Sequence, residues 1–210
     1  MFHLDLRCQK TVAAIHSTGS ETAQWDLGAG RGCNDGTKEQ WHESRHFAKL
    51  KRVTTPPALL SQIYNFRAIG ERLDTAGQPT ASQLRAVREA GFEVVINLAL
   101  PTSDNALADE GSVVTGFGMA YVYIPVDFKT PTSQDFHDFC RVMAAFDGRR
   151  VFVHCAANKR VSAFVFLYRV LHQRAVLAEA EQDLHAIWQP DEVWGRFVRN
   201  QLERSGHAAA

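Results

Sequence analysis

The chain has 210 residues, of which 45% are hydrophobic, so it is long enough for one domain of ordinary size with a real core. Lys plus Arg and Asp plus Glu number 23 each, and the resulting net charge of zero argues against a general binder of nucleic acid or of acidic membranes. No signal-peptide-like run opens the chain, and its longest apolar stretch is too short to span a membrane. The cysteines are too scattered for a disulfide framework or a CxxC metal pattern, which favours reduced thiols and a cytoplasmic location. They are Cys8, Cys33, Cys140 and Cys155.

Residues 1–55 differ in character from the rest of the chain and are predicted to form a poorly ordered N-terminal extension. Their glycine cluster, Gly28–Gly32, lacks the preceding strand and the following helix that a phosphate loop requires. His42 and His46 have the spacing of a helical metal pair, but no third ligand is near them. The sequence therefore predicts no metal site.

Strand and helix patterns alternate over residues 56–204, and residues 205–210 form a short tail. This alternation predicts an α/β domain with a mostly parallel central sheet flanked by helices. Ligands of such sheets bind beyond the carboxyl ends of the strands. The expected strands cover 92–98, 120–124 and 151–153, with a short strand or turn at 63–69, and the expected helices cover about 80–90, 106–115, 132–147, 162–171, 177–188 and 191–202.

The centre of the predicted domain is the segment in which a buried strand, Val151–Val153, runs into a polar loop over 154–160 and then into an apolar helix. The first backbone N–H groups of a helix have no internal partner, and the helix dipole is positive there, so this loop is a natural anion site. A cysteine in such a loop, here Cys155, would have its thiolate stabilised.

These residues resemble the signature loop of the cysteine-dependent protein-tyrosine and dual-specificity phosphatases, which reads His-Cys, five residues, Arg, then Ser or Thr. His154 and Cys155 match, and Ser162 is in register. Only four residues separate Cys155 from Arg160, and Val161 stands where the family has its arginine. The departure bears on catalytic competence more than on the fold.

The resemblance extends over roughly residues 60–203. The segments AGQPTASQL, EVVINLAL, YVYIPVD and HCAANKRVSAF look like a branch of small bacterial phosphatase-like proteins, related to the domain found in beta-lactamase-hydrolase-like proteins. It implies a phosphotyrosine protein phosphatase-like fold. It also implies hydrolysis of phosphate monoesters, on a protein or a small molecule, through a cysteinyl phosphate and without a cofactor.

The resemblance also implies residue roles. Cys155 would attack phosphorus, Arg160 would hold the phosphoryl oxygens in a bidentate contact, and the hydroxyl of Ser162 would cap the helix and donate to the sulfur. His154 is expected to support the loop through a ring bonded to the backbone. The loop amides would bind the remaining oxygens, and their residues are Ala156, Ala157, Asn158, Lys159, Arg160 and Val161. Among these, Asn158 tolerates the positive φ that a turning loop demands.

Asp127 is the candidate general acid. It lies in the loop Pro125–Pro131, which follows a predicted strand and resembles the mobile acid loop of dual-specificity phosphatases. Such an acid protonates the leaving oxygen and then, as a base, activates the water that cleaves the cysteinyl phosphate.

Two other functions fit the same residues. A rhodanese-like sulfurtransferase carries a cysteine persulfide in a loop of about this shorter length, but it needs neither Ser162 nor an acid loop. A non-catalytic module would keep the loop amides and bind phosphate without turnover, since the arginine is displaced. The physiological substrate and the oligomeric state are not set by the sequence.

Overall fold

The computed structural model describes residues 58–206. The predicted extension over 1–55, with its glycine cluster and its two histidines, lies outside the described residues, as do residues 207–210 of the tail. The strands are β1 (Arg67–Ala68), β2 (Leu73–Ala76), β3 (Val94–Asn97), β4 (Ala120–Tyr123) and β5 (Val151–His154). The helices are α1 (Ala81–Glu89), α2 (Glu110–Gly116), α3 (Ser133–Ala145), α4 (Lys159–His172), α5 (Leu177–His185) and α6 (Glu192–Arg204).

The five strands form one sheet in the order β1-β2-β5-β3-β4. The last four run parallel, whereas the short edge strand β1 pairs antiparallel with β2. The register sets Ala76 of β2 and Asn97 of β3 opposite His154 of β5. The segments that follow these strands therefore meet at one edge of the sheet.

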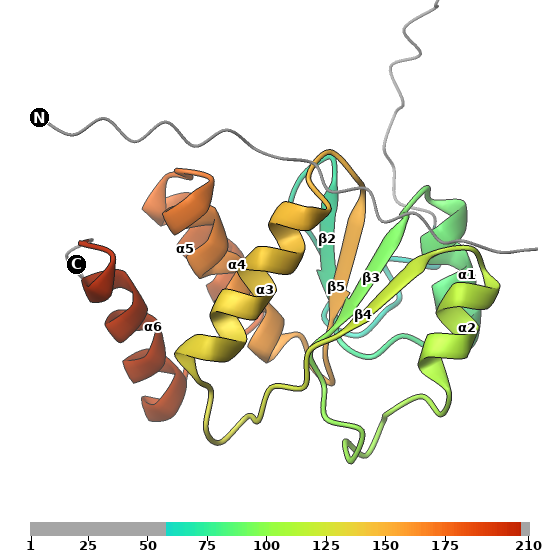
Figure 1. Cartoon of the computed structure of the whole chain (residues 1–210), viewed down its shortest axis with the longest axis horizontal. Coiled ribbons are helices and arrows are strands. Elements are labelled where there is room, and N and C mark those ends of the chain that lie inside the picture. The colour runs from blue at the N-terminus through green and yellow to red at the C-terminus, as the bar shows by residue number, and fades with distance from the viewer. Residues whose placement is uncertain (1–57, 207–210) are drawn as a thin grey trace, which may run out of the picture. The chain divides into compact units, whose positions relative to one another are not determined.

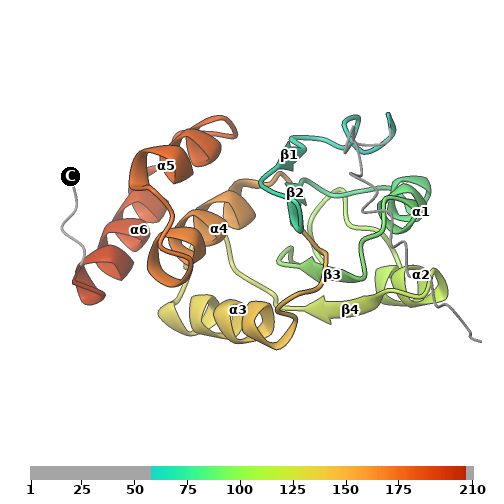
Figure 2. The ribbon, with the colours of Figure 1, turned by 90° about the horizontal axis from the view of Figure 1, so that it is seen from above.

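Helices cover both faces of the sheet. Figures 1 and 2 show α1 and α2 on one face and α3 and α4 on the other, with α5 and α6 packed outside α4. The larger of two core clusters joins the sheet to α3, α4 and α6, and the smaller one joins it to α1 and α2. The predicted α/β architecture with a mostly parallel sheet is confirmed.

The burial of the two central strands, β3 and β5, accounts for their apolar sequence pattern. All residues of β3 and β5 are buried, because each strand is covered on both faces, and such strands read as near-continuous apolar runs. For two helix starts the sequence offers a choice of cap, namely Thr80 or Ser82 for α1 and Thr132 or Ser133 for α3. Thr80 and Thr132 each form a capping box at the start of α1 and α3.

Some boundaries differ from the prediction. Strand β2 was not expected, because its buried residues include the polar Asp74 and Thr75 and so break the apolar pattern. The helix expected from residue 106 begins only at Glu110, after a loop, and the helix expected to end at Trp188 ends at His185.

The sequence pattern of the last helix predicts Val193, Trp194, Phe197 and Val198 on its inner face, but Val193 lies outside the core. Val193 of α6 is 41% exposed, whereas Trp194 and Phe197 are buried. Successive residues of a helix point about 100° apart, so a helix that buries Trp194 turns its preceding neighbour toward solvent.

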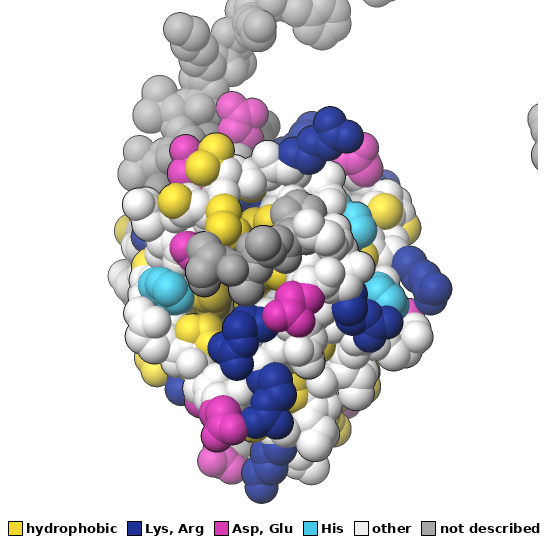
Figure 3. Space-filling model, turned by 90° about the vertical axis from the view of Figure 1, so that its left-hand side faces the viewer, with side chains coloured by type: hydrophobic (Ala, Val, Ile, Leu, Met, Phe, Trp, Pro, Cys, Tyr) yellow, Lys and Arg dark blue, Asp and Glu magenta, His cyan; other side chains and the backbone are white. Residues whose placement is uncertain are grey.

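The surface of the described part carries charges of both signs. Figure 3 faces the side of α5 and α6, where Lys and Arg side chains lie close to Asp and Glu side chains. Within residues 58–206, no helix combines the length and the apolar character needed to cross a membrane.

Candidate active site

The loop that contains Cys155 lies at the carboxyl edge of the sheet. It connects β5 to α4 and turns between Cys155 and Asn158. The N–H of Cys155 donates to Ala76 O at 3.3 Å, which fixes the loop to the end of β2. The loop therefore lies beyond the end of a buried parallel strand, which is where ligands of such sheets bind.

The carbonyl groups of the loop are held by neighbouring segments. The oxygen of Ala156 accepts hydrogen bonds from Gln78 N at 3.2 Å and Asn105 Nδ2 at 2.9 Å. The oxygen of Ala157 accepts from Asn65 Nδ2 at 3.0 Å. Two consecutive carbonyls are thus occupied by three different segments of the chain, none of which was assigned to the site from sequence.

The N–H groups of the same loop remain available. None of the following backbone N–H groups donates to another described residue. They belong to Ala156, Ala157, Lys159, Arg160 and Val161. Unpaired N–H groups that converge at the start of a 14-residue helix provide the donors that an oxyanion needs.

Asn158 makes this turn possible. Its φ is +62°, in the left-handed region, as the sequence predicted for a turning loop. Its side chain is fully buried, and Nδ2 donates to Asn65 O at 2.7 Å and to Thr75 Oγ1 at 3.0 Å. Asn158 therefore sets the backbone conformation and also ties the loop to β2.

The sulfur of Cys155 is almost fully enclosed. The residue is 1% exposed, belongs to the larger core cluster and forms no side-chain hydrogen bond with another described residue. A thiolate or an oxyanion at this position would depend for its hydrogen bonds on the unpaired amides of the loop.

Arg160 links the loop to the ends of two strands. It is 6% exposed, and its Nη1 donates to Leu98 O at 3.1 Å and to Val126 O at 2.8 Å. The other guanidinium nitrogens, Nε and Nη2, have no partner among the described residues, and neither is shut off from solvent. Nη1 of Arg160 thus links the loop to the two strand ends, and Nε and Nη2 can still contact a ligand.

Ser162 does not form the bond predicted for it. Its hydroxyl donates to Lys159 O at 3.0 Å and accepts from Trp188 Nε1 at 3.1 Å, and it forms no hydrogen bond with the sulfur of Cys155. The helix cap is Asn158, because the N–H of Ser162 already bonds Asn158 O at 2.8 Å inside the first turn. A serine at that position bonds back to a carbonyl of the preceding turn.

The ring of His154 contacts a different partner from the one predicted. Its ring is fully buried, and Nε2 lies 2.7 Å from Glu110 Oε1, without the alignment of a regular hydrogen bond. The other Glu110 oxygen accepts from Asn97 Nδ2 at 2.8 Å, and the same amide donates to Tyr121 OH at 3.1 Å. A backbone partner for the ring was expected, but a buried polar cluster below the loop takes its place.

A cavity of about 370 Å³ lies over this polar cluster. Its walls include Asn97, Glu110 and Tyr121, together with Gln78, whose N–H bonds Ala156 O. Burial raises the pKa of Tyr121 to about 12, so this phenol stays protonated at neutral pH.

Asp127 is exposed, and the backbone carbonyl groups of the residues before and after it each accept a hydrogen bond. Val126 O, on one side, is bound by Arg160, and Phe128 O, on the other, accepts from Trp194 Nε1 at 2.9 Å. One oxygen of the Asp127 carboxylate accepts from Lys129 N at 2.8 Å, so the side chain is held near its own loop. The bond from Arg160 links the residue before the candidate acid to a side chain from the first turn of α4.

Two tryptophans complete the surroundings, and the sequence had assigned them only to amphipathic helices. The ring of Phe128 lies 5.7 Å from both Trp188 and Trp194. The ammonium of Lys159 lies 5.1 Å from the centre of the Trp188 ring. A helix pattern reports which face is buried, but it does not report which segment that face meets. Among residues 58–206, no cluster of three or more His, Cys, Asp or Glu side chains could hold a metal ion.

Comparisons with known proteins agree with this geometry. Residues 44–193 match the family described as DSP-PTPase phosphatase fused to NAD+ kinase. A structure from Shewanella putrefaciens CN-32, described as a phosphatase (DUF442), is 34% identical with a TM-score of 0.65, over 71% of this chain and 98% of that one. A beta-lactamase hydrolase-like protein of Xylella fastidiosa is 30% identical over 122 residues, which is 56% of this chain. This chain spans only 28% of the length of the curated relatives that it matches.

More distant structures share the fold. P. aeruginosa TpbA in complex with pTyr is 16% identical with a TM-score of 0.53, over 64% of this chain and 83% of that one. PTPMT1 in complex with PI(5)P is 15% identical with a TM-score of 0.57, over 67% of this chain and 96% of that one. The predicted family resemblance is confirmed.

Proposed function

The chain belongs to the family described as DSP-PTPase phosphatase fused to NAD+ kinase, and on that premise we propose that it hydrolyses phosphate monoesters through a cysteinyl phosphate on Cys155. The observation that carries this proposal is the set of unpaired loop N–H groups around Cys155. Donors fixed before the reaction stabilise the charge that develops on the phosphoryl oxygens.

The reaction has two steps. The thiolate of Cys155 forms the S–P bond while the P–O bond to the leaving group breaks, and Asp127 gives its proton to the departing oxygen. A water molecule then attacks phosphorus and gives a proton to Asp127, while the P–S bond breaks. The products are the alcohol or phenol and inorganic phosphate, and the free thiolate is regenerated.

The remaining residues have supporting roles in this proposal. Nε and Nη2 of Arg160 contact the phosphoryl oxygens beside the loop amides. His154 and Asn158 hold the loop in shape, and Lys159 adds positive charge at its rim. Ser162 acts on the sulfur only if its hydroxyl leaves the carbonyl that it now bonds.

The substrate is proposed to be a phosphorylated protein or a phosphorylated small molecule. The structure of TpbA contains pTyr and that of PTPMT1 contains PI(5)P, so the shared fold accommodates both classes.

Cys155→Ser tests the proposal. The variant should lose hydrolysis of aryl phosphates by at least about 10³-fold, because a serine hydroxyl is far less ionised than a thiol. The wild-type reaction should also leave labelled phosphate on the peptide that contains Cys155 when it is quenched during turnover. Full, vanadate-sensitive activity in Cys155→Ser would disprove the mechanism.

The same preparation separates the two alternatives. Transfer of sulfur from thiosulfate to cyanide, without hydrolysis of an aryl phosphate, would indicate a sulfurtransferase. Binding of phosphate by both the wild type and Cys155→Ser, with no hydrolysis by either, would indicate a non-catalytic module.

A further inference from the structure

The loop that carries Asp127 packs against α6 and accepts one hydrogen bond from it. Trp194 is fully buried, and its Nε1 donates to Phe128 O at 2.9 Å. In the described part of the chain, this is the one hydrogen bond from α6 to residues 127–132. The indole also packs against the Phe128 ring at 5.7 Å, so one side chain contacts both the backbone and the side chain of the residue after Asp127.

On the other side of Asp127, the side chain of Arg160 from α4 holds the backbone. Arg160 Nη1 donates to Val126 O, and Val126 is fully buried. Asp127 therefore lies between a bond to α4 and a bond to α6. The peptide groups on both sides of it are oriented, although its own side chain is exposed.

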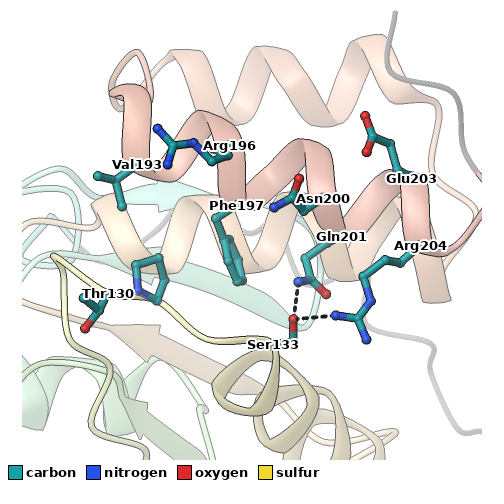
Figure 4. A pocket seen from close by; sticks show the side chains of 10 residues that line it. Thr130, Ser133, Val193, Arg196, Phe197, Asn200, Gln201, Glu203 and Arg204 are labelled. Carbon is teal, nitrogen blue, oxygen red and sulfur yellow. Dashed lines mark hydrogen bonds between the residues drawn. The ribbon is translucent and has the colours of Figure 1, made fainter.

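After Phe128, α6 donates no further hydrogen bond to the described chain until Ser133. A groove of about 400 Å³ separates the segment at Thr130 from α6, and Figure 4 shows Phe197 facing it. The next hydrogen bonds between the two elements are at Ser133, whose Oγ accepts from Gln201 Nε2 at 2.7 Å and from Arg204 Nη1 at 3.3 Å (Figure 4). The groove thus separates the bond from Trp194 from those two, and no second hydrogen bond from α6 reaches residues 127–132 in the described part of the chain.

We propose that Trp194 is a positioning residue, which holds the 126–128 backbone so that the Asp127 carboxyl can protonate the leaving oxygen. This inference rests on the proposed function, since it assumes that Asp127 is the acid. Proton transfer requires the acid within hydrogen-bond reach of the leaving oxygen, and an error of about 1 Å in such positioning is costly. Trp194 acts only through the backbone and does not touch the substrate.

The test compares aryl phosphates whose leaving phenols differ in acidity. A phenolate that is a good leaving group needs no proton, whereas a poor one does, so loss of the acid slows only the poor ones. Asp127→Asn should slow the poorest leaving groups by about 10²-fold. Trp194→Phe keeps a ring in the core but removes the N–H, and it should slow the same substrates by about tenfold while changing turnover of the best ones by less than about twofold.

Val198→Ala is the matched control. Val198 lies one turn after Trp194 on α6 and packs on the same core, without a hydrogen bond to the loop. It should reduce thermal stability but leave the dependence on the leaving group as in the wild type. The double variant Trp194→Phe with Asp127→Asn should be no slower than Asp127→Asn alone, because both changes remove one function.

Two outcomes would overturn the inference while leaving the nucleophile in place. One is that Trp194→Phe keeps the wild-type dependence of the rate on the leaving group, although Asp127→Asn changes that dependence. The other is an additive loss in the double variant, which would mean that Trp194 acts by a route other than Asp127. Failure of the proposed function would look different, because either Cys155→Ser would remain active or the wild type itself would hydrolyse no aryl phosphate.

Discussion

The two cysteines of the described structure differ in what surrounds them. Cys155 begins a loop with unpaired N–H groups, whereas Cys140 lies on the inner face of α3. Burial raises the pKa of Cys140 to about 12, so it remains a thiol at neutral pH. The apolar neighbours of Cys140 on its helix face also predict a core thiol from the sequence alone.

We therefore expect Cys140 to resist alkylation in the folded protein at about pH 8, because thiolate is the reactive form. Cys155 should be modified before Cys140, and inorganic phosphate should protect it. Peptide mass spectrometry after limited treatment with iodoacetamide measures both. Modification of Cys140 at the rate of Cys155 would contradict this assignment.

The buried carboxyl group of Asp74 on β2 makes the free energy of unfolding depend on pH. Burial raises the pKa of Asp74 from 3.8 to about 6, while the positive charge of Arg150 and a backbone hydrogen bond at Ile69 act in the opposite direction. The folded state then binds this proton more tightly than the unfolded state. Stability that is fully present below the unfolded pKa is lost as the pH rises through the folded pKa.

Asp74→Asn should remove this loss. The free energy of unfolding should rise relative to the wild type at about pH 8, by at most about 3 kcal/mol, and change little at about pH 3.5. Urea unfolding at the two pH values measures the difference. An equal effect of the substitution at both pH values would rule out the ionisation of Asp74 as the cause.

At the scale of elements, the end of β2 and the active-site loop approach closely at Gly77. A Cβ added there would lie 3.0 Å from Ala156 O and 3.0 Å from Tyr64 O, and both are backbone atoms that cannot turn aside. Gly77 is therefore needed for the close approach rather than for its conformational freedom.

Gly77→Ala should displace the loop and weaken binding of inorganic phosphate by about tenfold or more, since the bond from Gln78 N to Ala156 O depends on this approach. Gly70→Ala is the control, because a Cβ there meets nothing within 4 Å. Isothermal titration with phosphate compares the two variants. Equal phosphate affinity in both would show that the approach at Gly77 does not shape the site.

The sequence predicted those elements whose signal is local. The strand before Cys155, the left-handed turn at Asn158 and the caps at Thr80 and Thr132 each depend on residues next to them. The contacts that complete the site are not local. Asn65 lies 92 residues from the Ala157 carbonyl that it binds, and no pattern within either segment indicates that pairing.

The bond predicted for Ser162 shows a different limit. The family signature correctly places a hydroxyl at this position, but it does not say where the hydroxyl points. Trp188, 26 residues later, donates to it and competes with any bond to the sulfur. A motif gives residue types, whereas the direction of a side chain depends on neighbours from other elements.

At the scale of the whole molecule, the family match begins at residue 44, twelve positions before the predicted domain boundary at 56. We propose that the site is complete within residues 56–204, since every contact described above lies there. A chain that begins at residue 56 should then keep the melting temperature and phosphate affinity of the full chain. A large loss that is reversed when the chain begins at residue 44 would move the boundary to the start of the family match.

The proposed function depends on the unpaired N–H groups of the loop, and NMR can observe each of them. Titration of ¹⁵N-labelled protein with tungstate, a tetrahedral oxyanion, should shift the amide protons of the loop strongly downfield as they donate to it. These are the amides of Ala156, Ala157, Lys159, Arg160 and Val161. Saturable shifts confined to the loop and its immediate neighbours are the predicted result. Unchanged loop amides at saturating tungstate would contradict the account, because Cys155 would then lie in a loop that does not bind an oxyanion.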